Sequence, residues 1–525
     1  MKSILCSLLC VLALSVAQAD ETKSLAKPLS KSEIDTLVQR SMATFHVPGI
    51  ALAVIKDDKV VYSSGFGVRS LNAKQKVDEH TLFGIASNSK AFTSAALGML
   101  VDQKKIKWDD KVTDYIPEFK MYNPYVTDEF TIRDLLTHRS GLGLGAGDLM
   151  LWPEGSDFTR ADVIHNLRFL KPTSSFRSKY DYDNNLYIIA GEVVARVSGL
   201  SWEDFIGQHI FQPIGMTESA PSFFRLKDKS NIVAPHVEFD GKLQAVDAQL
   251  TEVSDAAAGI NSNLVDLSKW VRLQLNSGAY GKDLSQHLFS AEVQQEMWSP
   301  QTITPFDHKI NPYNTHFATY GLGWGLRDVN GYKQVGHTGG LTGVVTQVTL
   351  IPELKLGIIV LTNQQVGAAF SSITDTIKDA YFGLPKVDRI AQYHARLEEK
   401  SDEDAKAVAD VWAKVDAQKN AVNAIAPASL VGTYRDNWFG DVVLSYQDGK
   451  LLFTSAHSPK LKGEMFYYQG TTYAVKWFER SMLADAFATF SFGVDGKPTE
   501  IKMAAISEMT DFSYDFQDLD LKLVK

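Results

Sequence analysis

Residues 83–90 read Phe83-Gly84-Ile85-Ala86-Ser87-Asn88-Ser89-Lys90, and the apolar run Ala91–Val101 follows them. This run predicts a buried helix that opens with the pattern S-x-x-K. Because three residues make nearly one helical turn, we expect Lys90 on the face of Ser87, within reach of its hydroxyl. A desolvated lysine loses its proton more readily and can then serve as a base for a serine nucleophile.

The S-x-x-K pattern is a weak signal when it stands alone. Ser24-Leu25-Ala26-Lys27 also matches it, and most such matches are helix caps beside an exposed lysine. Two further triplets strengthen the interpretation, because Tyr182-Asp183-Asn184 is the one Y-x-N of the chain and His337-Thr338-Gly339 is its one [K/H]-T-G. We expect the second triplet at the end of a strand, where it would line a substrate. Three motifs in this order indicate one site.

These motifs resemble the serine β-lactamase and penicillin-binding-protein-like family, which includes class C β-lactamases, D-alanyl-D-alanine carboxypeptidases, D-aminopeptidases and some esterases. The resemblance covers residues 32–384, including a helix-and-turn signature over 131–142 and an F-x-P-L-G-M-T-like segment over 211–217. The sequence after Pro427 is similar to the β-rich carboxy-terminal domain of a branch that includes D-stereospecific serine peptidases.

The resemblance implies a role for each motif residue. Ser87 would attack a carbonyl and form an acyl-enzyme, while Lys90 and Tyr182 would share its proton and Tyr182 would return one to the leaving group. Asn184 would orient the substrate's amide. The backbone N–H groups of Ser87 and Gly340 would form the oxyanion hole, where a glycine leaves room for the substrate. The other substrate-binding residues would be His337, Thr338 and Gly339.

His337 departs from the pattern of class C β-lactamases, which usually have a lysine at this position. A lysine is a permanent cation, whereas an imidazole is mostly neutral near pH 7. Histidine here is similar to the D-peptidases and counts against a dedicated β-lactamase. Nearby, we expect His138 to pack or hydrogen-bond in the signature helix and Asp183 to be solvated. Trp152 would line the cleft or join the core.

Strand-like sequence flanks a mostly helical middle. The runs Ile50–Ile55 and Val60–Ser64 predict a hairpin at Asp57-Asp58, and three more strands are expected from Tyr332 onward, over 332–335, 344–351 and 356–361. This pattern predicts an α/β (α+β) unit. The resemblance makes it a β-lactamase/transpeptidase-like fold, with an antiparallel sheet flanked by helices and a helical subdomain. Turn pairs after Pro427 predict a small antiparallel barrel-like domain: Asp448-Gly449, Gln469-Gly470 and Asp495-Gly496.

The amino terminus has the features of a secretory signal. Lys2 precedes a short apolar stretch, and Ala17-Gln18-Ala19 fits an A-x-A cleavage site. We therefore expect a signal peptide over 1–19 and export to the periplasm or the outside, with no membrane anchor after cleavage. Three further parts would follow: a catalytic domain over 20–385, a charged, helical or disordered connector over 386–426, and the β-rich domain over 427–525.

The composition excludes several classes of protein. A net charge of −9 without a long basic block argues against nucleic-acid binding. The two cysteines, Cys6 and Cys10, are too few for a disulfide scaffold or a thiolate metal cluster. The chain contains no H-E-x-x-H or G-x-G-x-x-G motif, so we expect no metal or other cofactor.

The sequence therefore predicts an exported serine hydrolase that acts on small peptides containing D-amino acids. An esterase or weak class C-like β-lactamase is one alternative, and an inactive binding or scaffold homologue is another. The carboxy-terminal domain could bind a ligand, cover the site or join chains into a homo-oligomer, and the sequence leaves this choice open.

Overall fold

A computed structural model describes residues 26–248, 252–308, 311–418 and 425–524. The predicted signal peptide and both cysteines lie outside these ranges. So does the beginning of the second S-x-x-K match at Ser24.

A central antiparallel sheet organises the catalytic domain. It brings the first strands of the chain beside strands that lie far along the sequence, since Ile50 pairs with Thr362 and Lys56 pairs with Leu356. Within the described chain its eight strands run in the spatial order β2 (Lys59–Gly67), β1 (Gly49–Lys56), β14 (Leu356–Thr362), β13 (Val344–Ile351), β12 (Tyr332–Leu341), β11 (Gly325–Val329), β10 (Ala318–Tyr320) and β9 (Thr302–Ile303).

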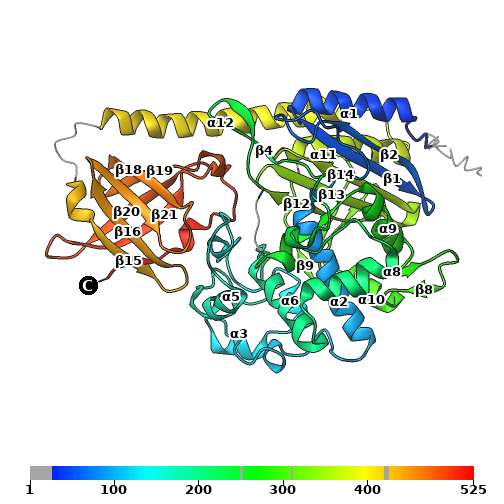
Figure 1. Cartoon of the computed structure of the whole chain (residues 1–525), viewed down its shortest axis with the longest axis horizontal. Coiled ribbons are helices and arrows are strands. Elements are labelled where there is room, and N and C mark those ends of the chain that lie inside the picture. Colours follow the sequence, from blue (N-terminus) through cyan, green and yellow to red (C-terminus); the bar gives the residue numbers. More distant parts are fainter. Residues whose placement is uncertain (1–25, 249–251, 309–310, 419–424, 525) are drawn as a thin grey trace, which may run out of the picture.

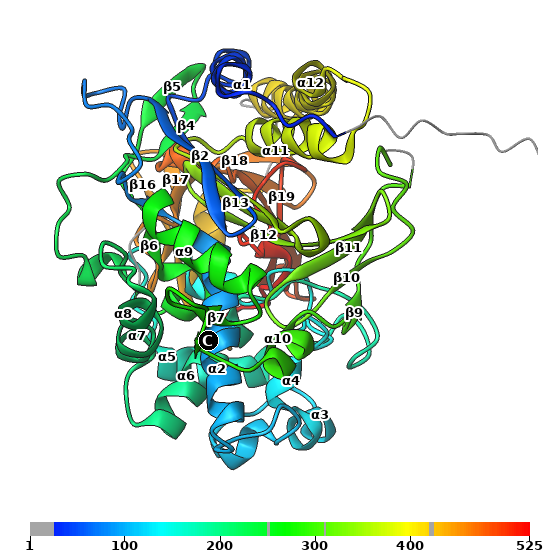
Figure 2. The same cartoon turned by 90° about the vertical axis from the view of Figure 1, so that its right-hand side faces the viewer.

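Helices cover both faces of this sheet (Figure 2). On one face lie α1 (Lys31–Phe45) and α11 (Gly367–Phe382), and on the other lie α2 (Ser89–Asp102) and α9 (Leu264–Leu275). The central strands are therefore buried on both sides, which explains why β1 and β14 consist of continuous apolar runs instead of alternating ones. This arrangement confirms the predicted α/β fold.

The predicted hairpin forms between β1 and β2. Asp57 and Asp58 both have positive φ angles, 51° and 61°, as a tight hairpin turn requires. The strand that carries His337 differs from the prediction. Since Gly339 and Gly340 still pair with Thr346 and Val345 of β13, β12 continues through the triplet to Leu341 instead of ending there.

A mostly helical subdomain lies beside the sheet. Its helices, together with α10 near the sheet edge, are α3 (Pro124–Glu129), α4 (Ile132–Leu135), α5 (Arg160–Asn166), α6 (Asn185–Ser198), α7 (Trp202–Phe205), α8 (Gln212–Ile214) and α10 (Ala291–Met297). Three short strand pairs complete the domain: β3 (Phe83–Gly84) with β6 (Asn261–Ser262), β4 (His236–Phe239) with β5 (Lys242–Ala245), and β7 (Ala279–Tyr280) with β8 (Gln286–His287).

The long helix α12 (Arg389–Ala417) joins the two domains along one edge of the molecule (Figure 1). Arg389 pairs with Asp379 of α11 at one end, and the Trp412 ring packs against Phe466 of the barrel at the other. Among the described residues, no helix has both the length and the apolar character that crossing a bilayer requires.

The carboxy-terminal domain is a closed antiparallel barrel, as predicted. Its described strands are β15 (Gly432–Asp436), β16 (Gly440–Gln447), β17 (Lys450–Ser455), β18 (Lys462–Gln469), β19 (Thr472–Trp477), β20 (Ala486–Phe492), β21 (Pro498–Ala505) and β22 (Leu521–Leu523). Gly449, Gly470 and Gly496 have positive φ angles in the turns that the sequence indicated. Large apolar side chains such as Trp477 and Tyr473 are buried in this domain and contribute to its core.

Candidate active site

The nucleophile segment is held in a strained turn. Ser87 lies in a 3-10 turn, Ala86–Asn88, that leads into α2. Ala86 has a φ of 49°, a left-handed conformation that is costly for a residue with a Cβ. The turn is fixed at the Ile85 carbonyl, which accepts hydrogen bonds from Asn88 Nδ2 (3.2 Å) and Thr346 Oγ1 (3.0 Å). The backbone of Ser87 is thereby tied to the sheet.

Lys90 lies one turn after Ser87 and is completely buried. Its Nζ lies 3.0 Å from Ser87 Oγ, 2.7 Å from Asn184 Oδ1 and 3.1 Å from the Ala257 carbonyl oxygen. Burial lowers the pKa of Lys90 to about 7, although nearby Asp148 opposes this shift. A large fraction of Lys90 is therefore neutral at physiological pH, and its lone pair can accept the hydroxyl proton of Ser87.

The phenol of Tyr182 lies close to both Ser87 and Lys90. The ring centroid is 4.8 Å from Lys90 Nζ. Burial raises the pKa of Tyr182 well above 10, and a hydrogen bond with Ser87 opposes this shift only in part. Tyr182 therefore keeps its proton near neutral pH. It can donate a hydrogen bond or a proton, whereas the neutral amine of Lys90 can accept one.

His138 packs against the Tyr182 ring. Its ring lies 4.1 Å from the Tyr182 ring, and its Nδ1 accepts the backbone N–H of Asp183 at 3.1 Å. Burial lowers the pKa of His138 well below 6.5, so the ring is neutral. This fits the expectation that His138 packs and hydrogen-bonds. It contacts the motif but not Ser87.

The Y-x-N triplet enters α6 at Asn184, and its last two residues face inward. Asn184 Oδ1 accepts a hydrogen bond from Lys90, and its Nδ2 donates to Asp148 Oδ2 at 2.7 Å, so both ends of the amide contact protein groups. The expectation that Asp183 is solvated is wrong. Asp183 is fully buried and accepts the N–H of Leu186 at 3.3 Å, which caps the first turn of α6.

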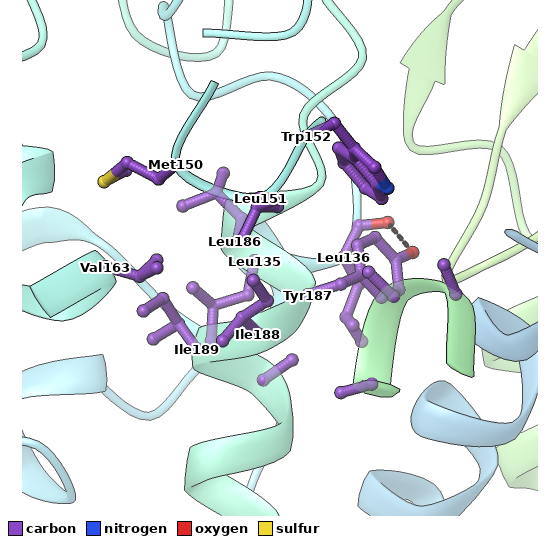
Figure 3. Close-up of a cluster of buried hydrophobic side chains, with 14 of the residues drawn as sticks. Leu135, Leu136, Met150, Leu151, Trp152, Val163, Leu186, Tyr187, Ile188 and Ile189 are labelled. Atoms are coloured by element: carbon purple, nitrogen blue, oxygen red, sulfur yellow. Dashed lines mark hydrogen bonds between the residues drawn. The ribbon is translucent and has the colours of Figure 1, made fainter. Parts of the chain in front are cut away.

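A hydrophobic cluster anchors this entry to α6 (Figure 3). Leu186, Ile188 and Ile189 of the helix pack near Met150 and Leu151, which come from the loop before α5. The Tyr187 hydroxyl adds a hydrogen bond of 2.7 Å to the Leu136 carbonyl oxygen. The first turn of α6 therefore cannot shift without disrupting the core, and this fixes the positions of Tyr182 and Asn184.

Strand β12 places the third motif opposite Ser87. His337 Nδ1 lies 2.5 Å from the Thr338 carbonyl oxygen and Nε2 lies 2.8 Å from Tyr320 Oη. Because a carbonyl oxygen can only accept, Nδ1 carries the proton and Nε2 accepts from Tyr320. Burial, with Lys90 as a second cause, lowers the pKa of His337 to about 4. Among these motif residues, any positive charge near neutral pH therefore comes from the protonated fraction of Lys90.

The two glycines of β12 have different surroundings. A Cβ at Gly339 would lie 2.2 Å from the Ile85 carbonyl oxygen and 2.5 Å from Thr346 Oγ1, so only glycine lets β12 lie against the nucleophile segment. A Cβ at Gly340 would meet nothing within 4 Å. Gly340 and Thr338 are exposed, so the strand presents open backbone beside Ser87.

The motif residues line a cavity of about 660 Å³. Its wall includes Ser87, Tyr182, Asn184 and the stretch 336–342. Trp152 lines it as well and is also largely buried, so both roles considered for this residue apply. The barrel supplies another part of the wall, with Ser481, Met482, Leu483, Met509, Asp511, Phe512, Ser513 and Tyr514.

All the residues predicted for the site thus lie around one cavity or directly behind it. Reasoning from the sequence missed four contributors: Asp148, the Ala257 carbonyl, Tyr320 and Ser513. None of them lies in a motif, and each comes close to the site only through tertiary contacts. Within the described residues, no cluster of three or more His, Cys, Asp or Glu side chains could hold a metal ion.

Known proteins match both parts of the chain. Residues 34–382 match the beta-lactamase family, and residues 416–522 match a domain of unknown function (DUF3471). The octameric penicillin-binding protein homologue from Pyrococcus abyssi superposes with a TM-score of 0.61 at 20% identity, covering 94% of this chain and 100% of that one. This superposition shows that the two chains share a fold.

Two curated relatives extend the comparison. Unguisins hydrolase ungD of Aspergillus violaceofuscus is 28% identical over 79% of this chain and 76% of its own length. Protein flp of Staphylococcus aureus strain MW2 is 27% identical over 64% of this chain, and the match spans 63% of flp, less than two thirds. The S-x-x-K serine contacts its lysine and one relative is named as a hydrolase, so the site is of the serine hydrolase type. Because the family model matches most of its length, the chain belongs to the beta-lactamase family.

Proposed function

We propose that the protein is an exported serine hydrolase that forms an acyl-enzyme on Ser87 and acts on peptides containing D-amino acids. The observation that carries the proposal is the pair formed by Ser87 and Lys90. The two side chains are 3.0 Å apart, and the buried amine has a pKa of about 7.

The proposed reaction follows from these protonation states. Ser87 Oγ attacks the carbonyl carbon while its proton passes to Lys90 Nζ, and the backbone N–H groups of Ser87 and Gly340 stabilise the oxyanion. The bond to the leaving group breaks as the leaving group takes a proton from the Tyr182 phenol, which recovers one from Lys90. Water then attacks the acyl-enzyme by the same route in reverse, which frees the acid and restores the Ser87 hydroxyl.

Two features favour D-peptides over β-lactams as substrates. His337 is neutral above about pH 4, so it offers no permanent cation to the carboxylate of an antibiotic. Histidine at this position, followed by a β-rich domain, also resembles the D-peptidase branch. The fungal relative, named as a hydrolase of unguisins, supports hydrolysis in general.

A panel of matched substrates tests this proposal. It compares D- and L-alanine p-nitroanilide, a D-Ala-D-Ala peptide, p-nitrophenyl acetate and a chromogenic cephalosporin on one preparation, with Ser87→Ala as the blank. We expect kcat/KM at least about tenfold higher for the D-anilide than for its L-enantiomer, a difference of about 1.4 kcal/mol in the transition state. Equal rates for the two enantiomers, or turnover of the ester alone, would favour the esterase alternative and refute the D-peptide proposal.

Export is proposed from residues 1–19. Expression of the full chain in a bacterial host should yield a secreted or periplasmic protein whose first residue is Asp20. A product that stays in the cytosol and still begins with Met1 would contradict the proposed export.

A further inference from the structure

Several barrel residues contact the catalytic domain, among them Trp438, His457 and Lys460, and one loop of the barrel reaches the active site. This docking loop (residues 507–515) lies between β21 and β22, in the red part of the chain that faces the catalytic domain in Figure 1. Asp515 is fully buried there and accepts the backbone N–H groups of Gly147 (2.6 Å) and Leu149 (2.9 Å). The loop is therefore fixed to the stretch of the catalytic domain that carries Asp148.

The fit between the loop and the catalytic domain is close. A Cβ at Gly145 would lie 2.5 Å from the Phe512 carbonyl oxygen, so a glycine is required where the two backbones meet. The Phe512 ring packs edge-on against Tyr182, with centroids 5.7 Å apart. The loop thus contacts one of the motif residues directly.

A continuous chain of hydrogen bonds leads from the loop to the nucleophile. Ser513 Oγ donates to Asp148 Oδ2 at 2.9 Å, and Asn184 Nδ2 donates to the same oxygen at 2.7 Å. Asn184 Oδ1 accepts from Lys90 Nζ at 2.7 Å, and Lys90 Nζ lies 3.0 Å from Ser87 Oγ. Ser513 is the one member of this chain that belongs to the barrel.

We propose that the barrel completes the active site, with Ser513 as a positioning residue that holds Asp148, and through it Asn184, so that Lys90 stays aligned on Ser87. This inference rests on the acyl-enzyme mechanism proposed above but not on D-peptides as the substrate.

The charges around Asp148 explain why its partner matters. Asp148 is fully buried, and within the described residues its Oδ1 has no hydrogen-bond partner, so Oδ2 makes its polar contacts. Burial raises the pKa of Asp148 well above its usual value, Asp183 adds to the shift, and Asn184, Ser513 and Lys90 oppose it. Removing the Ser513 hydroxyl therefore favours the protonated, uncharged form of Asp148.

A change in the charge of Asp148 shifts the pKa of Lys90 in one direction. The carboxyl groups that face Lys90 are Asp148 and Asp183, which raise its pKa, while His138 and His337 are held neutral. The rings of Tyr182 and Tyr187 also lie against Lys90 Nζ, and burial raises the pKa of both phenols, so they keep their protons. Asp515 of the barrel faces Asp148 rather than Lys90. If Asp148 loses negative charge, the pKa of Lys90 falls. The rate of any reaction that needs neutral Lys90 falls at low pH, where Lys90 becomes protonated. This part of the pH–rate profile, the acid limb, then moves to lower pH.

The test measures how fast Ser87 reacts with a fluorophosphonate probe between pH 5 and pH 10. Compared with the wild type, we expect Ser513→Ala to lower the maximal rate of probe labelling about tenfold, because one buried hydrogen bond is then misaligned. We also expect the acid limb of the labelling rate to move to lower pH. Ser513→Thr keeps the hydroxyl and should restore both. Since the probe is not a peptide, failure of the D-peptide proposal leaves this readout intact.

Ser507→Ala is the matched control. Ser507 belongs to the same loop, but its hydroxyl donates to Asp404 of α12 at 2.7 Å, away from Asp148. We expect this variant to react with the probe as the wild type does. An unchanged rate and pH profile in Ser513→Ala, or equal effects of the two alanine variants, would overturn the inference.

A double mutant tests the route. In Asp148→Asn the carboxylate charge is already absent. Adding Ser513→Ala to this variant should therefore leave the acid limb at the same pH as in Asp148→Asn alone. A further shift of the same size as in the single mutant would show that Ser513 acts through another group, which contradicts the proposal.

Discussion

Lys90 Nζ lies 3.0 Å from Ser87 Oγ and is completely buried, with three hydrogen-bond partners around it. Burial favours the neutral form of this lysine, which can act as a base, because it removes the solvent that would otherwise stabilise the ammonium. The same burial keeps the Tyr182 phenol protonated. The site therefore holds two neighbouring neutral groups, an amine that can accept a proton and a phenol that can donate one.

The first prediction concerns pH. Because Lys90 has a pKa of about 7 and acts as a base when it is neutral, the acylation rate should rise through pH 7 and level off above it. At pH 6 the rate should be about one tenth of the plateau, since about one tenth of Lys90 is then neutral. Stopped-flow acylation between pH 5 and pH 9 measures this limb. A rate that is independent of pH from 5 to 8 would exclude Lys90 as the base.

The second prediction concerns Tyr182. Tyr182→Phe removes the phenolic proton but keeps the ring that packs against His138 and Phe512. We expect kcat to fall by about 10²–10⁴, the usual contribution of a proton-transfer group, with little change in the melting temperature. Steady-state kinetics and thermal unfolding of the same sample check both parts. A loss of less than about threefold would mean that Lys90 serves the leaving group directly.

The third prediction uses the two glycines of β12 as a matched pair. Gly339→Ala should lower the melting temperature, because its Cβ would lie 2.2 Å from the Ile85 carbonyl oxygen. Gly340→Ala should fold normally, since its Cβ would meet nothing within 4 Å, but should slow acylation by crowding the substrate. Calorimetry and probe labelling separate the two effects. Equal loss of stability in both variants would contradict this reading of the strand.

The fourth prediction concerns the missing cation. His337→Lys should raise kcat/KM for a cephalosporin about two- to fivefold, since a partly exposed ion pair contributes up to about 1 kcal/mol. The new charge should also lower the pKa of Lys90 and move the acid limb to lower pH. His337→Gln, which stays neutral, is the control. If the lysine and glutamine variants have equal cephalosporin turnover, charge at this position does not limit β-lactamase activity.

The sequence predicted the parts of the structure that local patterns encode. The hairpin at Asp57-Asp58, the helix after Ser87 and the glycine turns of the barrel each depend on residues close together in the chain. The environment of Asp183 was mispredicted, because its burial depends on the packing of α6 and not on its neighbours in sequence. Ser513 could not be found at all, since its contact with Asp148 spans 365 residues.

The end of β12 shows a second limit. The sequence predicts that the His337-Thr338-Gly339 triplet lies at the end of a strand, where it would line a substrate. In the structure Gly339 and Gly340 continue the pairing with β13, and the close approach of the nucleophile segment excludes any larger residue at Gly339. The constraint comes from a partner distant in sequence.

Acylation of Ser87 is tested most directly by the mass of the intact protein after reaction with an acylating substrate under acid quench. We expect one adduct of the acyl mass, on the peptide that contains Ser87, and no adduct in Ser87→Ala. An adduct that persists in Ser87→Ala, or a wild-type protein that turns over substrate without modification of Ser87, would contradict it.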